Sequence, residues 1–252
     1  MTLRRSVQSA ARRLLFAATI GLGAVTSGAS AQVAGIHGWH DPYENFNRGV
    51  HRFNKGFDRA FFRPAAIGYG TVMPDVVETV VQNVVNNLRH PARAVNYLLQ
   101  ADLESSARTF GRFGINSVFG LGGIADPATD FGLSDRPTDF GATLHAWNVA
   151  PGVYLELPFV GPRSARAAAG LIVDAVIDPV TWLLPSRHDA ALWSASILDR
   201  LSARNQSRDM IDALLYESPD SYRTLRTSYV QNRQRQLDKD ILEENLEDPY
   251  AE

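Results

Sequence analysis

Residues 74–88, with the sequence PDVVETVVQNVVNNL, decide the fold class of this chain. Their apolar side chains recur one and four positions apart, which lines one face of a helix but would scatter over both faces of a strand. Valine by itself favours strands, so the spacing and not the composition carries the prediction. Pro74 and Asp75 suit the first turn of a helix, where a carboxylate meets the positive end of the dipole.

Helical spacing continues on both sides of this stretch. Pro91 is predicted to end the first helix and to begin another, because proline lacks the backbone N–H that a helix interior uses. Further helices are predicted at residues 103–118, 162–177 and 189–217, whereas residues 153–159 have the pattern of an extended segment. The sequence therefore predicts a mainly α, single domain at residues 41–230 with at most a short β-hairpin.

The two ends of the chain differ from this domain. Residues 1–31 combine an arginine-rich start, a short apolar run and the small residues Ala29-Ser30-Ala31, which is typical of a secretory signal peptide. Residues 32–40 are predicted to be a flexible lead. Residues 231–252 are charged and poor in apolar side chains, which predicts a solvated helix that frays into a disordered tail.

Composition excludes several classes of protein. The chain has no cysteine, which excludes disulfides, thiolate metal sites and the cysteine that a lipoprotein anchor needs. The formal net charge of −2 gives no general attraction for nucleic acid. No stretch after Ala31 is as long and apolar as a transmembrane helix. The expected protein is exported but is not anchored by a lipid.

A phenylalanine stripe is the most distinctive surface pattern. Phe46, Phe53, Phe57 and Phe61 recur at helical spacing, and arginine and lysine side chains lie elsewhere on the same helix. Such a helix fits a membrane interface, with aromatic rings at the depth of the acyl chains and cations near the phosphates. A helix that faces an ordinary protein core has the same pattern, so the sequence leaves both interpretations open.

Signs of catalysis are weak. The chain has no G-x-S-x-G, H-E-x-x-H or phosphate-loop motif, and its histidines lack the spacing of metal ligands. His37 and His40 lie near Asp41 but fall in the predicted lead, which favours a solvated linker. Asp126 and Asp139 occupy positions where aspartate caps helices or begins turns. We expect no enzyme activity, no metal and no cofactor.

An ordered series of short motifs resembles the MlaA/VacJ family, and it extends over about residues 41–184. It begins with Asp41-Pro42-Tyr43-Glu44-Asn45-Phe46-Asn47-Arg48. It continues through Arg63-Pro64, Gly68-Tyr69, Pro74, Asn86-Asn87-Leu88-Arg89, Pro91, Val95-Asn96, Leu98-Leu99-Gln100, Gly111-Arg112-Phe113, Asn116-Ser117, Gly120-Leu121-Gly122-Gly123, Asp126, Asp139-Phe140-Gly141, Thr143-Leu144, Gly152-Val153-Tyr154, Leu157-Pro158, Gly161-Pro162 and Asp178-Pro179.

The resemblance implies a ring-like helical protein with amphipathic interfacial helices, in the inner leaflet of the outer membrane and facing the periplasm. It implies an amphipathic channel that removes mislocalised phospholipid from the outer leaflet and passes it to a periplasmic lipid-carrier protein, which maintains lipid asymmetry. It also implies association with a trimeric porin. Many members of the family are lipoproteins, and the missing cysteine is a departure from them. An envelope phospholipase and a periplasmic adaptor that binds only protein are the competing interpretations.

Candidate site residues follow from the resemblance and from the glycine-rich block at residues 139–162. Channel or gate positions that would face acyl chains are Phe140, Leu144, Trp147, Tyr154 and Phe159, and those that would face a polar lumen are Asn116, Asp139 and Thr143. Gly141, Gly152 and Gly161 are the candidate hinges, and Phe46, Phe53, Phe57 and Phe61 the candidate membrane-facing residues. Plain core packing is the alternative at each of these positions.

Overall fold

A computed structural model describes residues 40–180 and 189–244, with side chains between 193 and 238 in the second range. The chain divides into Met1–His37 and Gly38–Glu252, and the described residues belong to the second unit. The predicted signal peptide, almost all of the predicted lead and the last eight positions, 245–252, lie outside the described residues.

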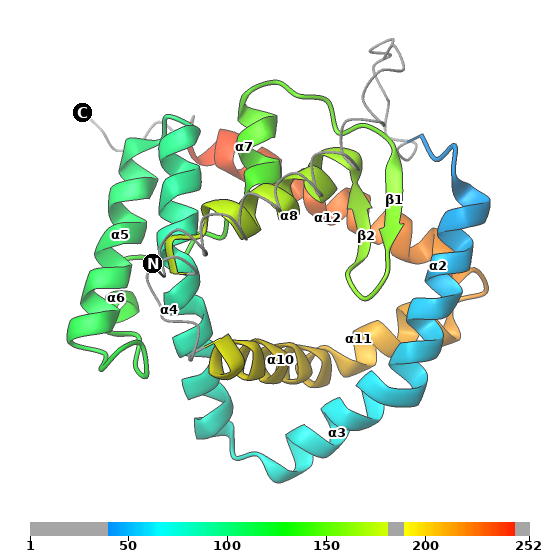
Figure 1. Cartoon of the computed structure of the whole chain (residues 1–252), viewed down its shortest axis with the longest axis horizontal. Coiled ribbons are helices and arrows are strands. Elements are labelled where there is room, and N and C mark those ends of the chain that lie inside the picture. The colour runs from blue at the N-terminus through cyan, green and yellow to red at the C-terminus, as the bar shows by residue number, and fades with distance from the viewer. Residues whose placement is uncertain (1–39, 181–188, 245–252) are drawn as a thin grey trace, which may run out of the picture. The chain divides into compact units, whose positions relative to one another are not determined.

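Helices make up most of the described chain (Figure 1). In order the elements are α2 (Glu44–Phe57), η2 (Asp58–Phe62), α3 (Arg63–Val72), α4 (Asp75–Leu99), α5 (Leu103–Val118), α6 (Pro127–Asp130), α7 (Phe140–Ala146), β1 (Tyr154–Leu157), β2 (Gly161–Ser164), α8 (Ala165–Ile177), α10 (Asp189–Gln206), α11 (Arg208–Asp212), η4 (Ala213–Glu217) and α12 (Ser221–Glu244). Within these residues the β structure is one antiparallel pair, in which Tyr154 faces Ser164 and Leu157 faces Gly161. The predicted mainly α fold with a short hairpin is confirmed.

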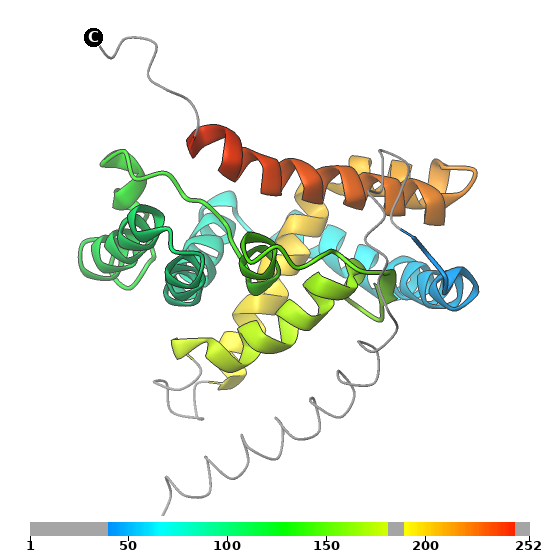
Figure 2. The same cartoon turned by 90° about the horizontal axis from the view of Figure 1, so that it is seen from above.

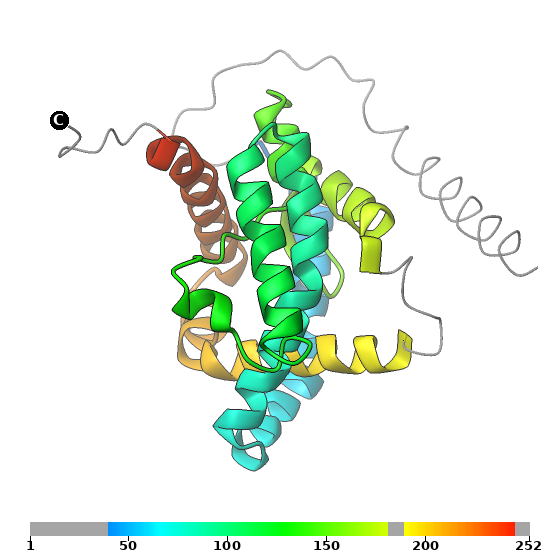
Figure 3. The ribbon, with the colours of Figure 1, turned by 90° about the vertical axis from the view of Figure 1, so that its left-hand side faces the viewer.

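The elements follow one another in a closed circuit. α2 continues through η2 into α3, and α10 packs on both α3 and α4 (Figure 1). α4 contacts α7, α7 packs on α8, and the hairpin that precedes α8 returns to α2. α5 lies beside α4 and α10 crosses below them (Figure 3), while α12 extends along one face of the domain (Figure 2). This arrangement brings residues from both ends of the domain together.

The prediction that Pro91 separates two helices is wrong. α4 runs unbroken from Asp75 to Leu99 with Pro91 in its interior, although proline leaves the carbonyl of Asn87 without its usual helical donor. On either side of Pro91 the helix buries His90, Ala94 and Tyr97. Packing of this face outweighs a local penalty of about 3 kcal/mol.

The interior is rich in polar side chains. Arg204 of α10 is buried, and it donates to Asp58 of η2 at 2.9 Å and to Asp212 at the end of α11 at 2.6 Å. Arg63 donates to the same Asp212, and the Tyr216 hydroxyl donates to Asp58. We call Arg63, Asp58, Arg204, Asp212 and Tyr216 the ionic cluster. It connects η2 and α3, early in the domain, to α10, α11 and η4.

The C-terminal helix is longer than the sequence pattern indicates. α12 continues to Glu244, past the predicted domain boundary at residue 230, with Leu237 buried and Arg233 paired to Asp139. These contacts supply the apolar and ionic anchors that the charged composition of residues 231–244 does not suggest. In the described part of the chain no helix has both the length and the hydropathy to cross a bilayer.

Candidate functional site

The phenylalanine stripe of α2 and η2 is on the surface. Phe46 and Phe61 are 68% and 66% exposed, and Phe53 and Phe57 are also exposed, so the core-facing interpretation of this stripe is wrong. Phe159 joins them from the hairpin turn, with ring centroids 5.1 Å from Phe53 and 5.0 Å from Phe57. Together these five residues form what we call the aromatic surface. An exposed cluster of this kind marks an interaction site more often than chance.

A strained backbone holds Phe159 in this position. Its φ of 62° lies in the left-handed region, which is an outlier for a bulky side chain. Its backbone N–H donates to the Asn54 side chain at 2.9 Å, and Asn54 also donates to the Leu157 carbonyl at 3.0 Å. The turn is therefore fixed to α2 on both sides of residue 158. Figure 1 shows the hairpin beside α2.

The polar face of α2 carries the other attachment of the hairpin. Asn47 is fully buried, donates to the Tyr154 carbonyl at 3.1 Å and accepts from the Glu156 N–H at 3.0 Å. It also donates to Asp41 at 2.8 Å, and Asp41 pairs with Arg226 of α12. Asn47 thus gives the β1 backbone two hydrogen bonds that a neighbouring strand would otherwise supply. The aromatic surface and its polar support lie on neighbouring faces of α2, and the hairpin contacts both.

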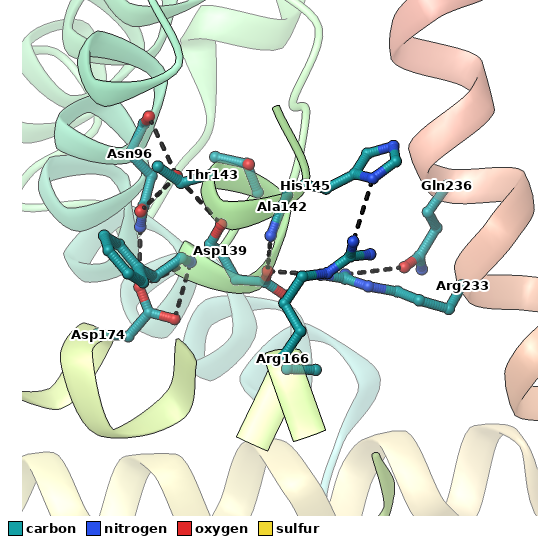
Figure 4. A network of polar contacts seen from close by, with 12 residues as sticks. Asn96, Asp139, Ala142, Thr143, His145, Arg166, Asp174, Arg233 and Gln236 are labelled. Atoms are coloured by element: carbon teal, nitrogen blue, oxygen red, sulfur yellow. Dashed lines mark hydrogen bonds and ion pairs between the residues drawn. The ribbon is translucent and has the colours of Figure 1, made fainter. Parts of the chain in front are cut away.

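The block around α7 contains most of the predicted channel residues. Asp139 caps α7 by accepting from the Ala142 N–H at 2.8 Å and pairs with Arg233 at 2.6 Å (Figure 4). Thr143 is fully buried, donates to Asn96 at 2.9 Å and accepts from Gln100 at 3.0 Å. Its hydroxyl is used by the protein, so in this conformation Thr143 offers no group to a polar lumen.

Asn116 and Tyr154 are equally occupied by protein contacts. Asn116 is buried, donates to Asp126 at 2.7 Å and accepts from the Ala128 N–H at 3.0 Å. Tyr154 is fully buried and its hydroxyl donates to Glu156 at 2.6 Å. Its hydroxyl therefore contacts a carboxylate, whereas the sequence-based expectation is contact with an acyl chain. Burial beside that carboxylate raises the pKa of Tyr154. Both side chains hold the frame of the domain in this conformation.

Three further predicted channel residues, Phe140, Leu144 and Trp147, lie along α7 and at its C-terminal cap. Trp147 is exposed, its ring lies edge-on to that of Phe140 with centroids 5.8 Å apart, and its Nε1 donates to the Leu99 carbonyl at 2.9 Å. Leu144 is half-buried on the same helix. The lipid-facing role of these three residues stays a prediction.

The three predicted hinge glycines have different surroundings. Gly141 has ordinary helical backbone, and a Cβ on the facing Gly170 would come within 2.5 Å of its backbone nitrogen, so this pair allows a close approach of α7 and α8. Gly152 and Gly161 have φ values of 72° and 85°, which glycine adopts without strain. At these two positions glycine is required by the turn itself, and hinge motion stays a prediction.

Comparison with known proteins agrees with this arrangement. The family model described as "MlaA lipoprotein" matches residues 39–236. This chain belongs to the MlaA family. The intermembrane phospholipid transport system lipoprotein MlaA of Escherichia coli K12 is 32% identical over 229 residues, covering 86% of this chain and 84% of that protein. An uncharacterized protein of Rickettsia prowazekii is 35% identical over 190 residues, covering 75% of this chain and 74% of that protein.

A solved structure supports the fold of this MlaA-family chain. This structure, from work on the "Structural basis for maintenance of bacterial outer membrane lipid asymmetry", matches with a TM-score of 0.66 and 28% sequence identity. The match covers 78% of this chain and 98% of that chain. The first family motif has a structural role here, because Asp41 and Arg48 both bond to α12 or to the residue that precedes it.

Sequence reasoning missed the polar stripe of this MlaA-family protein. Asn47, His51, Asn54 and Asp58 recur at intervals of four, three and four, which is the helical period also followed by the phenylalanines. All four point into the protein, where they meet β1, α10 and α12. The stripe was visible in the sequence, but polar residues at that spacing are usually read as the solvent-facing side.

One serine and one histidine lie as they do in hydrolases. His51 Nε2 is 3.0 Å from Ser221 Oγ, and His51 Nδ1 is 3.5 Å from Glu156 Oε1. However, Lys55 Nζ donates to the same Ser221 oxygen at 3.1 Å, and all three side chains of the trio are buried. The His51 Nδ1 makes no hydrogen bond among the described residues. The described side chains also contain no cluster of potential metal ligands.

Proposed function

We propose that this protein takes part in phospholipid transport between the membranes of the bacterial envelope. The aromatic surface is the observation that carries the proposal, because five exposed phenylalanines beside a polar frame suit contact with lipid and not with water. Membership of the MlaA family and the name of the Escherichia coli relative support the same function.

We further propose where in the envelope the protein lies and which partners it contacts. The protein would lie at the inner leaflet of the outer membrane, held by the aromatic surface without a lipid anchor. There it would take up mislocalised phospholipid beside a trimeric porin and pass it to a periplasmic carrier. Trp147, Phe140 and Leu144 are the candidate lipid contacts, since Trp147 is exposed and the three side chains lie near one another. The transfer needs no bond cleavage.

Deletion of the gene in its own host tests the function. We expect more phospholipid in the outer leaflet, measured by labelling intact cells with a membrane-impermeant amine reagent. Re-expression of the wild-type chain should restore asymmetry, and a chain with Phe53→Ser and Phe57→Ser should restore less. Unchanged asymmetry after deletion would overturn the proposal.

The phospholipase alternative has its own test, because Ser221, His51 and Glu156 are close together. Purified protein is incubated with phospholipid vesicles, and released fatty acid is measured. Release that a Ser221→Ala variant abolishes would favour a hydrolase. We expect no release, since Lys55 and burial leave the serine oxygen without access to an ester.

A further inference from the structure

Three basic side chains converge where α7, α8 and α12 meet (Figure 4). Arg166 of α8 donates from Nη1 to the Val149 carbonyl at 2.6 Å and lies 3.2 Å from His145 Nδ1. Arg233 of α12 reaches the same place and pairs with Asp139 at 2.6 Å. We call Arg166, Arg233 and His145 the basic junction.

The charges in this junction do not balance. Arg166 is only 7% exposed, yet none of the described side chains supplies a carboxylate within ion-pairing distance of it. Asp139 already serves Arg233 and the N-terminus of α7. Asp238 of α12 acts only through its field, on His145. Buried charges are normally paired, so an uncompensated guanidinium needs an explanation.

Further features make a cation unfavourable at this point. Arg166 is in the first turn of α8, where the helix dipole is positive and acidic residues are the favoured ones. Burial and the neighbouring Arg233 both lower the pKa of Arg166, while Tyr229 and Asp139 raise it less. Because arginine keeps its proton in proteins, the result is a standing positive field and not a neutral group.

His145 adds a donor to this field. Burial, Arg166 and Arg233 lower the pKa of His145, which keeps its ring neutral near pH 7. A neutral ring that accepts from Arg166 at Nδ1 carries its proton at Nε2. Arg166 Nε and Nη2 also make no hydrogen bond to the described residues. Donors from two side chains therefore remain unused in one place.

The surroundings are open on one side and apolar next to the charges. The Asp139 side chain is 41% exposed and His145 is half-buried, so the junction borders the surface. Val149, whose carbonyl holds Arg166, is exposed, and so is Trp147 on the same segment. A ligand with an anionic group and an adjoining hydrocarbon part would match both the basic side chains and the exposed apolar residues beside them.

We propose that the basic junction binds the phosphate group of a phospholipid, with Arg166 and His145 as donors and Trp147 and Val149 beside the glycerol and acyl part. The proposal rests on the proposed function and adds to it the residues that recognise the head group. Planar guanidinium groups bind phosphate oxygens in pairs, which no lysine reproduces.

Binding to the full-length purified protein in a neutral detergent tests this. The probes are dihexanoyl-phosphatidylglycerol, dihexanoylglycerol, which lacks the phosphate, and inorganic phosphate. We expect the phospholipid to bind at least about tenfold more tightly than dihexanoylglycerol, and Arg166→Gln to remove at least about tenfold of that affinity. Arg166→Lys should restore only part of it. Arg108→Gln, whose arginine pairs with Glu104 on α5, is the matched control and should bind as wild type does.

A second readout needs no variant, in case Arg166→Gln does not fold. The pKa of His145, followed by NMR of labelled histidine in the wild-type protein, should rise when phospholipid binds because an anion then faces the ring. An unchanged pKa, equal binding of dihexanoylglycerol, or full affinity in Arg166→Gln would each overturn the proposal. A response to inorganic phosphate with none to the phospholipid would overturn the lipid as ligand.

The site and the function can fail separately. Normal lipid asymmetry after gene deletion, together with tight phospholipid binding that depends on Arg166, would overturn the function and support the site. Lost asymmetry after deletion, restored in full by Arg166→Gln, would overturn the site and support the function.

Discussion

The aromatic surface and the ionic cluster meet on neighbouring faces of the helix that runs through α2 and η2, and they have opposite compositions. Phe57 and Phe61 are exposed, whereas Asp58 between them is buried against Arg204. In a protein surrounded by water the distribution is normally the reverse, since burying a charge is costly and burying a phenylalanine is favourable. On this helix the phenylalanines are outside and the Asp58–Arg204 ion pair is inside.

Exposed phenylalanines next to buried charges indicate that this face of the domain fits a hydrocarbon environment. Exposed phenylalanines cost little in contact with hydrocarbon, while a charged outer face there would be expensive. Around Asp58 and Arg204 the interior is then held by hydrogen bonds and ion pairs. If the two regions have separate roles, changes in the ionic cluster should affect stability and changes in the aromatic surface should affect membrane binding.

Removing the centre of the ionic cluster should have the largest effect on stability. Arg204→Ala leaves the Asp58 and Asp212 carboxylates without their shared partner, and we expect a loss of about 3–5 kcal/mol in the free energy of unfolding. Denaturant unfolding of the purified protein measures it. Arg208→Ala is the matched control, because this arginine is exposed and pairs with an exposed carboxylate, and it should change stability by less than about 0.5 kcal/mol. Equal losses in both variants would mean that the cluster does not hold the domain.

Separating the hairpin from α2 should have the next largest effect. Asn47→Ala leaves the Tyr154 carbonyl and the Glu156 N–H without partners in the interior, and we expect a loss of about 2–3 kcal/mol. Hydrogen exchange should show the greatest loss of protection at β1. Asn45→Ala on the exposed side of α2 is the control. Unaltered protection at β1 would contradict the assigned role of Asn47.

The same contrast separates what the sequence predicts from what it does not. Helical periodicity predicts α2, α5, α8 and the two parts of α4 on either side of Pro91, because one face of each is marked by apolar spacing. It could not tell which face of α2 is inside, since the rule that apolar means buried fails for the phenylalanines of this helix. The motifs identified the family but not the structural roles of the residues within them.

Site residues were hardest to predict where contacts join distant parts of the chain. Arg166 and Arg233 are 67 positions apart in the sequence, and nothing local marks them as neighbours. Asn116 and Thr143 were predicted from motifs, yet their bonds to Asp126 and Asn96 depend on tertiary packing. The predicted helix break at Pro91 was wrong for the same reason, because packing against neighbouring helices keeps α4 continuous.

Changing the aromatic surface should affect membrane binding and not folding. We expect Phe46→Ser with Phe61→Ser to lower partition into phospholipid vesicles by about tenfold or more, because two large apolar side chains lose their contact with lipid. Vesicle co-sedimentation measures the partition. The stability of the same variant in buffer should stay within about 0.5 kcal/mol of wild type. Phe46→Leu with Phe61→Leu is the control and should keep most of the binding. A variant that unfolds but still binds vesicles would reverse the roles of the two regions.

Acid should weaken the attachment of α12 by a small amount. The hydrogen bond from Arg48 lowers the pKa of Asp220 from 3.8 to about 2, so the ionised carboxylate stabilises the folded state above about pH 4 and this contribution is lost as the pH falls toward 2. The pair is partly exposed, which limits its worth to no more than about 1 kcal/mol. Asp220→Asn should therefore be less stable than wild type at pH 6 and nearly equal to it near pH 2, as measured by thermal unfolding. Asp209→Asn, at an exposed carboxylate, should show no such convergence. A gap that stays constant with pH would mean that Asp220 acts through packing and not through its charge.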